Sequence, residues 1–117
     1  MPATPEELAA IEARLRAILV PYESRLETAS IYGIPTLRKP GAKAHDWFAF
    51  VKPEPKHVSF YLLPMVNHPS VLDGASPALL KRRAGKSMFK FTAPDEPLFA
   101  ELETVVAKAY EAYAGSA

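Results

Sequence analysis

The feature that most constrains the fold of this chain is a bend formed by Tyr32-Gly33-Ile34-Pro35-Thr36. Glycine can adopt backbone conformations with positive φ, so Gly33 suits a tight turn. Pro35 fixes its own φ and drives the preceding Ile34 into an extended conformation. A helical pattern precedes this segment and a strand pattern follows it, so the bend predicts an α+β fold. Its role is architecture rather than chemistry.

Length and composition indicate one globular domain. A chain of 117 residues with 49% apolar and 23% charged side chains is long enough to bury a core. We therefore expect a single domain over residues 1–117. The absence of cysteine excludes disulfides, thiolate metal sites and cysteine nucleophiles, and it fits a cytoplasmic protein.

No segment of the sequence has the pattern of a membrane anchor. Residues 1–7 lack a basic start followed by an apolar run, so we do not expect a signal peptide there. The longest apolar runs are broken by proline or charge well before the ~20 residues that a spanning helix needs. We therefore expect no membrane among the partners of this chain.

The N-terminal residues carry the signals that start a helix. Thr4 is a good N-cap, Pro5 suits the first helical position, and Glu7 completes a capping box. Apolar residues at positions 8, 11, 15, 18 and 19 then form one stripe with helical spacing. Pro21 ends this helix or restarts it. Residues 22–28 are predicted to form a second short helix.

Short strands are expected around two aromatic segments. Residues 47–51 are apolar on both faces, whereas residues 57–62 alternate and place one apolar side toward the core. The proline-containing residues 52–56 connect them as a hairpin loop. Residues 36–39 are predicted to form a short strand before this hairpin, and residues 87–91 an alternating strand after it.

Helical segments are expected in the second half of the chain. Residues 69–73 fit a single helical turn. Ser76 as N-cap, a proline after it and Gly85 past the end predict a helix over residues 77–84. The last helix begins near Pro97, and its predicted buried stripe consists of Leu98, Leu102, Val105, Val106, Ala109 and Tyr113.

The order of these segments resembles the YdhG-like family of small bacterial domains. The resemblance covers about residues 10–113, and its two motifs are the Tyr-Gly-x-Pro-Thr bend at residues 32–36 and the segment at residues 85–91. It implies a single-layer, mostly antiparallel sheet covered by N-terminal and C-terminal helices. Some members are described as frataxin-like intracellular iron chaperones. The resemblance therefore implies a small non-enzymatic binding or chaperone-type protein, with iron as its ligand.

Candidate metal ligands are the histidines and the acids of the terminal helices. The histidines are His45, His57 and His68, with Asp46 and Asp73 nearby in sequence. No two of them have His-x-x-x-His spacing, which favours ordinary surface histidines over a preformed site. A frataxin-like protein would bind iron weakly through carboxylates, here Glu6, Glu7, Asp95, Glu96, Glu101 and Glu103. The alternative is that these acids complement the helix dipoles and solubilise the helices.

Basic residues are gathered in the middle of the chain. Residues 36–91 carry ten basic side chains against three acidic ones, whereas both ends are acidic. The run Lys81-Arg82-Arg83 lacks interleaved exposed aromatic residues, so the pattern disfavours nucleic acid as a partner. Positive charge at the end of a helix is also what the macrodipole favours.

A small-anion site is the alternative function. Lys86 follows a glycine turn and matches a lysine of the family pattern, but a lysine alone is a non-directional charge that needs hydroxyl partners. We therefore predict a ligand-binding cleft that uses Tyr32, Gly33, Pro35, Tyr61, Lys86 and Lys90. Such a cleft would serve binding or an uncharacterised enzymatic activity.

No catalytic residue can be named from the sequence. It contains no Ser-His-Asp order, no carboxylate pair and no glycine-rich phosphate loop, so a non-enzymatic role is favoured. Residues 47–51, apolar on both faces, indicate that a loop, a ligand or another subunit covers the second face of the sheet. A protein-interaction module, including a homo-oligomer, is therefore the third functional class.

Overall fold

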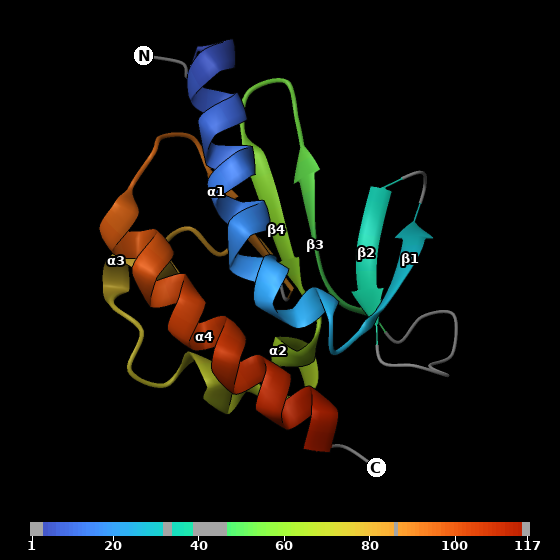
Figure 1. The fold of residues 1–117 in the computed structure, drawn as a ribbon. Coiled ribbons are helices and arrows are strands. Elements are labelled where there is room, and N and C mark those ends of the chain that lie inside the picture. The colour runs from blue at the N-terminus through green and yellow to red at the C-terminus, as the bar shows by residue number, and fades with distance from the viewer. Residues whose placement is uncertain (1–3, 32–33, 39–46, 86, 116–117) are drawn as a thin grey trace.

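The computed structural model describes residues 4–31, 34–38, 47–85 and 87–115. Its strands are β1 (Glu27–Ile31), β2 (Ile34–Arg38), β3 (Trp47–Pro53), β4 (Val58–Leu62) and β5 (Met88–Phe91). Its helices are α1 (Pro5–Glu23), α2 (Pro64–Asn67), η1 (Pro69–Leu72), α3 (Pro77–Leu80) and α4 (Glu96–Gly115). The five strands form one antiparallel sheet in the order β1-β2-β3-β4-β5, and α1 and α4 lie over one face of it (Figure 1). The predicted α+β fold, with helices from both ends of the chain on an antiparallel sheet, is confirmed.

Helix α1 begins as predicted. The Thr4 hydroxyl accepts a hydrogen bond from the Glu7 N–H at 3.1 Å, and the Glu7 carboxylate accepts one from the Thr4 N–H at 3.0 Å. These two bonds form the capping box that satisfies the first free N–H groups of the helix. The side chains that α1 buries against the sheet are Ile11, Leu15, Ile18 and Leu19.

The end of α1 differs from the prediction. The helix continues through Pro21, and the short helix predicted over residues 22–28 is wrong because β1 already begins within that range. Proline removes only one helical hydrogen bond, and the ring of Tyr22 packs on Phe48 of β3 with centroids 5.6 Å apart. This contact holds the last turn of the helix against the sheet.

The predicted strands are found with shifted ends. β2 begins at Ile34, earlier than the strand predicted over residues 36–39, and β3 extends to a proline that was assigned to the hairpin loop. The hairpin between β3 and β4 is closed by the Glu54 N–H, which donates to the His57 carbonyl at 2.8 Å. Tyr32 and Gly33 lie outside the described residues, and so does the positive φ predicted for Gly33.

The segment before β5 differs most from the prediction. The helix predicted over residues 77–84 ends at Leu80, although Ser76 caps α3 as expected. The chain then runs beside β5, where the Lys90 N–H donates to the Arg82 carbonyl at 2.7 Å. Gly85 has a φ of +85°, so it serves the turn into β5 rather than the end of the helix.

A β-bulge in β3 decides which aromatic side chains enter the core. Leu37 of β2 pairs with Ala49 while the next residue, Arg38, pairs with Trp47, so Phe48 is the extra residue. Phe48 therefore lies on the helix-covered face, where its ring contacts Tyr22, Tyr110 and Tyr113 at centroid distances of 5.6, 5.8 and 5.4 Å. The stripe predicted for the last helix is confirmed, and its members are all buried.

Candidate functional site

The face of the sheet opposite α1 and α4, here called the outer face, carries the sequence-predicted Tyr61 and Lys90. Val58 and Phe60 lie on the helix-covered face, so strand alternation directs Ser59 and Tyr61 to the outer face. Tyr61 stacks on Phe50 of β3 with ring centroids 4.4 Å apart and planes at 12°.

Most of the apolar side chains of residues 47–51 lie on the helix-covered face of the sheet, so the strand is less apolar on its other face than the sequence predicts. Phe48, Ala49 and Val51 face the helices and belong to the main core cluster. Phe50 is the side chain that turns to the outer face, where it is only 6% exposed beside Tyr61. On the outer face, Phe50 is therefore a covered aromatic side chain. That a ligand or another subunit covers this face stays a prediction.

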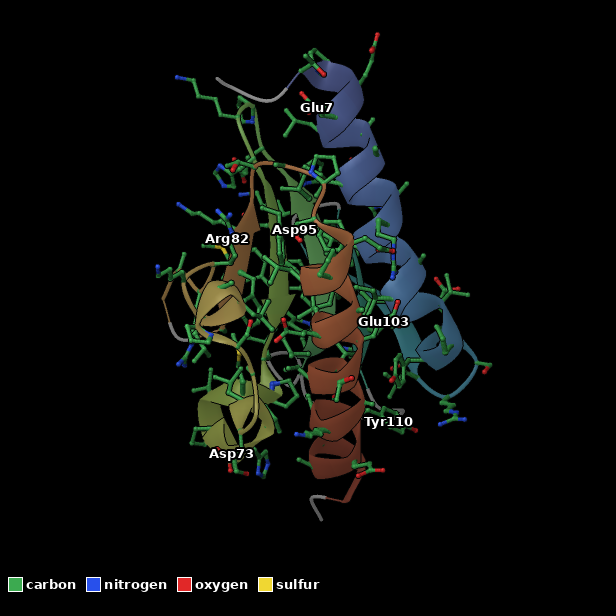
Figure 2. The ribbon with its side chains drawn as sticks, turned by 90° about the vertical axis from the view of Figure 1, so that its left-hand side faces the viewer. Glu7, Asp73, Arg82, Asp95, Glu103 and Tyr110 are labelled. Carbon is green, nitrogen blue, oxygen red and sulfur yellow. The ribbon has the colours of Figure 1, made fainter. Side chains whose placement is uncertain are left out.

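A line of polar side chains crosses the outer face next to these rings. Lys52 of β3 pairs with Ser59 of β4, and Ser59 pairs with Lys90 of β5. Beyond β5, the bridge between Arg83 and Phe89 places Arg82 directly opposite Lys90. We call the set Arg82, Lys90, Ser59 and Lys52 the basic row. Figure 2 shows Arg82 on the side of the sheet away from α1.

Arg82 and Lys90 form an unfavourable pair of like charges. Residues directly opposite one another on antiparallel segments have Cβ atoms about 4.5–5.5 Å apart, and like charges in this position destabilise a sheet. Both side chains are exposed, and no ion pair to either is found within the described ranges. The repulsion between them is therefore not compensated by a neighbouring carboxylate of this part of the chain.

Several other cations of the fold have carboxylate partners. Lys52 pairs with Glu54 at 3.0 Å, and this hydrogen bond raises the pKa of the Lys52 ammonium. Elsewhere, Arg38 pairs with Glu27, Arg16 with Glu12, and Arg14 with both Glu96 and Glu103. Arg82 and Lys90 differ from these cations because neither has a carboxylate partner among the described residues. Their positive charge therefore favours binding of an external anion.

The structure brings together only part of the predicted cleft. Tyr61 and Lys90 are diagonal neighbours across β4 and β5, a relationship that spans about 7–8 Å and is within reach of long side chains. Pro35 belongs to β2, which β3 and β4 separate from β5, a distance of about 14 Å at the usual strand spacing. Tyr32, Gly33 and Lys86 lie outside the described residues, so their place in a cleft stays a prediction.

Sequence reasoning missed Ser59 and Arg82. Ser59 is 1% exposed, and the sequence predicts for it only a place in an alternating strand. Arg82 was assigned to the end of a helix, where the macrodipole explains a positive charge. The signal that could have revealed it is the short distance along the chain between the basic run and β5, with Gly85 between them as a turn residue.

Most of the carboxylates considered for iron have structural partners. Glu7 belongs to the α1 capping box, Glu96 and Glu103 both bind Arg14, and Glu101 accepts two hydrogen bonds from Ser76. Hydrogen bonding by Glu96 is the main cause that raises the pKa of the Arg14 guanidinium above its ordinary value. Within the ranges that the structure describes, no three side chains of His, Asp or Glu come together as a metal site. His45 and Asp46 lie outside those ranges.

Comparison of the chain with protein-family models, curated proteins and solved structures finds no match. The resemblance to the YdhG-like family therefore remains a prediction. Among the described helices, none combines the length and the apolar character required to cross a membrane.

Proposed function

We propose that this protein is a small anion-binding protein that holds a phosphate group on the basic row. The observation that supports this function is the placement of Arg82 opposite Lys90 without a carboxylate partner among the described residues. A bound anion would relieve the repulsion between the two cations. It would also make charge-assisted hydrogen bonds, which are stronger than neutral ones.

The side chains of the row have complementary roles. The planar guanidinium of Arg82 can hold two phosphate oxygens at once, whereas the ammonium of Lys90 acts as a mobile point charge. Ser59 lies between Lys90 and Lys52 but is only 1% exposed, so the direct contacts of the row to an anion come from its charged side chains. Tyr61, diagonal to Lys90, offers a further hydroxyl at the edge of the row.

The row is better suited to binding than to catalysis. Its guanidinium, ammonium and hydroxyl groups donate hydrogen bonds, whereas catalysis would also need a placed base or an activated nucleophile. The Glu54 carboxylate beside it is held by Lys52. Phe50 is covered, so the flat aromatic surface that stacks the bases of a single-stranded nucleic acid is not offered here. We therefore infer a small ligand rather than a polymer.

Calorimetric titration with pyrophosphate at low ionic strength tests this function. We expect saturable binding that Arg82→Ala and Lys90→Ala each weaken by about tenfold or more, because each removes a charge-assisted hydrogen bond. Lys56→Ala is the matched control, since Lys56 is an exposed lysine in the loop between β3 and β4 and outside the row. Its dissociation constant should equal that of the unmodified protein.

The melting temperature separates loss of binding from loss of fold. Neither Arg82→Ala nor Lys90→Ala should lower the melting temperature without pyrophosphate, and both should abolish the rise that pyrophosphate causes. Absence of saturable binding to the unmodified protein would reject the function. Equal weakening by Lys56→Ala would show that pyrophosphate responds only to total charge. Iron handling and protein interaction, with YdhG-like membership, remain alternative proposals.

A further inference from the structure

A groove between α1 and α4 lies on the other side of the molecule from the basic row. It has a volume of about 310 Å³ and is lined by Ala17, Ile18, Pro21 and Tyr22 of α1 together with Glu103 of α4. The ion pair of Arg14 with Glu103 lies on its α4 side, and the contact between Tyr22 and Tyr110, with centroids 5.0 Å apart, lies farther along both helices. Figure 2 shows Glu103 and Tyr110 on the side of α4 that faces α1.

Pro21 leaves a backbone acceptor in the wall of this groove. In an α-helix the N–H of each residue donates to the carbonyl four residues earlier, and proline has no N–H. The carbonyl of Ala17 therefore lacks its helical donor. Ala17 and Pro21 both line the groove. Helix geometry directs the Ala17 carbonyl toward Pro21, so we expect this oxygen on the groove side of α1.

Negative charge prevails at the α4 side of the groove. Arg14 supplies one positive charge to the two carboxylates of Glu96 and Glu103. Its guanidinium engages Oε1 of Glu103, and within the described part of the chain no hydrogen bond reaches Oε2. One carboxylate oxygen and one carbonyl oxygen are thus available to a ligand that donates hydrogen bonds.

We infer that this groove binds a small primary amine with an apolar body. The ammonium group donates to the Glu103 carboxylate and to the Ala17 carbonyl, while the apolar body covers Ile18 and Pro21. The ring of Tyr22 adds a favourable surface for a cation. The site shares no residue with the basic row. Amine binding can therefore be confirmed or rejected independently of the proposed anion-binding function.

Titration of the full chain with 2-phenylethylamine, followed by amide chemical shifts, tests this inference. We expect saturable shifts at residues 17–22 and near Glu103, and at least about tenfold weaker binding of the uncharged analogue 2-phenylethanol. Glu103→Gln keeps the shape but removes the charge, and it should weaken amine binding by about tenfold. Glu6→Gln, in the first turn of α1 and away from the groove, is the matched control and should leave binding unchanged.

The substitution Pro21→Ala separates a built site from a passive hollow. Alanine restores an N–H that hydrogen-bonds the Ala17 carbonyl, so α1 should become more stable while amine binding weakens by about tenfold. Amine binding that survives both Pro21→Ala and Glu103→Gln would overturn the inference. Equal affinity for 2-phenylethanol would overturn it too, as would shifts confined to residues outside the groove.

Discussion

Glu101 on α4 accepts hydrogen bonds from both the backbone N–H of Ser76, at 2.8 Å, and the Ser76 hydroxyl, at 2.9 Å. The Ser76 oxygen in turn accepts the N–H of Leu79 and so caps α3. One carboxylate therefore ties the connection between β4 and β5 to the C-terminal helix. From the sequence, Glu101 is predicted either to bind iron weakly or to solubilise the helix, and no structural partner is expected for it.

Replacing Glu101 by alanine should destabilise the fold by about 1–3 kcal/mol, because a partly buried N–H and hydroxyl lose their acceptor. Urea denaturation measures the change. Glu111→Ala, at an exposed position of the same helix, should stay within about 0.5 kcal/mol of the unmodified protein. A double-mutant cycle with Ser76→Ala should show strong coupling, and additive losses would contradict the contact.

Release of the terminal-helix carboxylates tests the iron proposal. If these groups bind ferrous ion weakly, Arg14→Gln should increase the affinity because it frees both Glu96 and Glu103. Arg16→Gln, which frees the single carboxylate of Glu12, is the control and should change little. Anaerobic calorimetry measures both. Absence of iron uptake by the unmodified protein and by Arg14→Gln alike would remove the iron proposal.

The sequence predicts helices and strands better than it predicts which distant residues are in contact. Capping by Thr4 and Ser76 and the buried stripe of α4 depend on local spacing, which the sequence displays directly. The helix predicted over residues 22–28 is wrong because local propensity contains no information about Phe48, which packs on Tyr22 from a distant strand. Tertiary contact overrode local preference there.

The candidate site was less accessible to sequence reasoning. The sequence predicts Tyr61 and Lys90 as site residues, and they do lie near one another. The same sequence patterns predict that Arg82 ends a helix and that Ser59 is an ordinary alternating strand residue, so neither is predicted for the site. The order of the strands in the sheet decides which of these residues become neighbours. Composition does not predict that order. Pro35 illustrates the same limit, because β3 and β4 stand between it and β5.

The repulsion between Arg82 and Lys90 should lower the free energy of unfolding by a measurable amount. Lys90→Glu should raise the free energy of unfolding by about 0.2–1 kcal/mol, because it converts a like-charge pair with Arg82 into an opposite-charge pair. It should also abolish pyrophosphate binding. Urea denaturation without pyrophosphate, at low ionic strength, gives the comparison. Lys56→Glu controls for the change in net charge, and an equal gain from it would show that Arg82 is not the partner.

The bulge predicts that two neighbouring phenylalanines differ in importance. Phe48→Ala should cost about 3–5 kcal/mol, because the ring is fully buried among Tyr22, Tyr110 and Tyr113. Phe50→Ala should cost less, since Phe50 lies outside the main core cluster and stacks on Tyr61 at the outer face. Chemical denaturation of both variants measures the difference. A larger loss from Phe50→Ala would contradict the assignment of the two faces.

Tyr22 should make the fold sensitive to alkaline pH. Burial raises the pKa of its phenol above the ordinary value of 10.0, against a smaller opposing effect of Arg25. The folded protein therefore keeps the Tyr22 proton to a higher pH than the unfolded chain does. This contribution to stability is complete below the unfolded pKa of about 10 and is lost as pH rises through the folded value.

Other groups also titrate in this range, so the measured quantity is the difference between the unmodified protein and Tyr22→Phe in urea denaturation from about pH 8 to 11. The unmodified protein should lose more stability than the variant above about pH 10, and parallel curves would show that Tyr22 is not responsible.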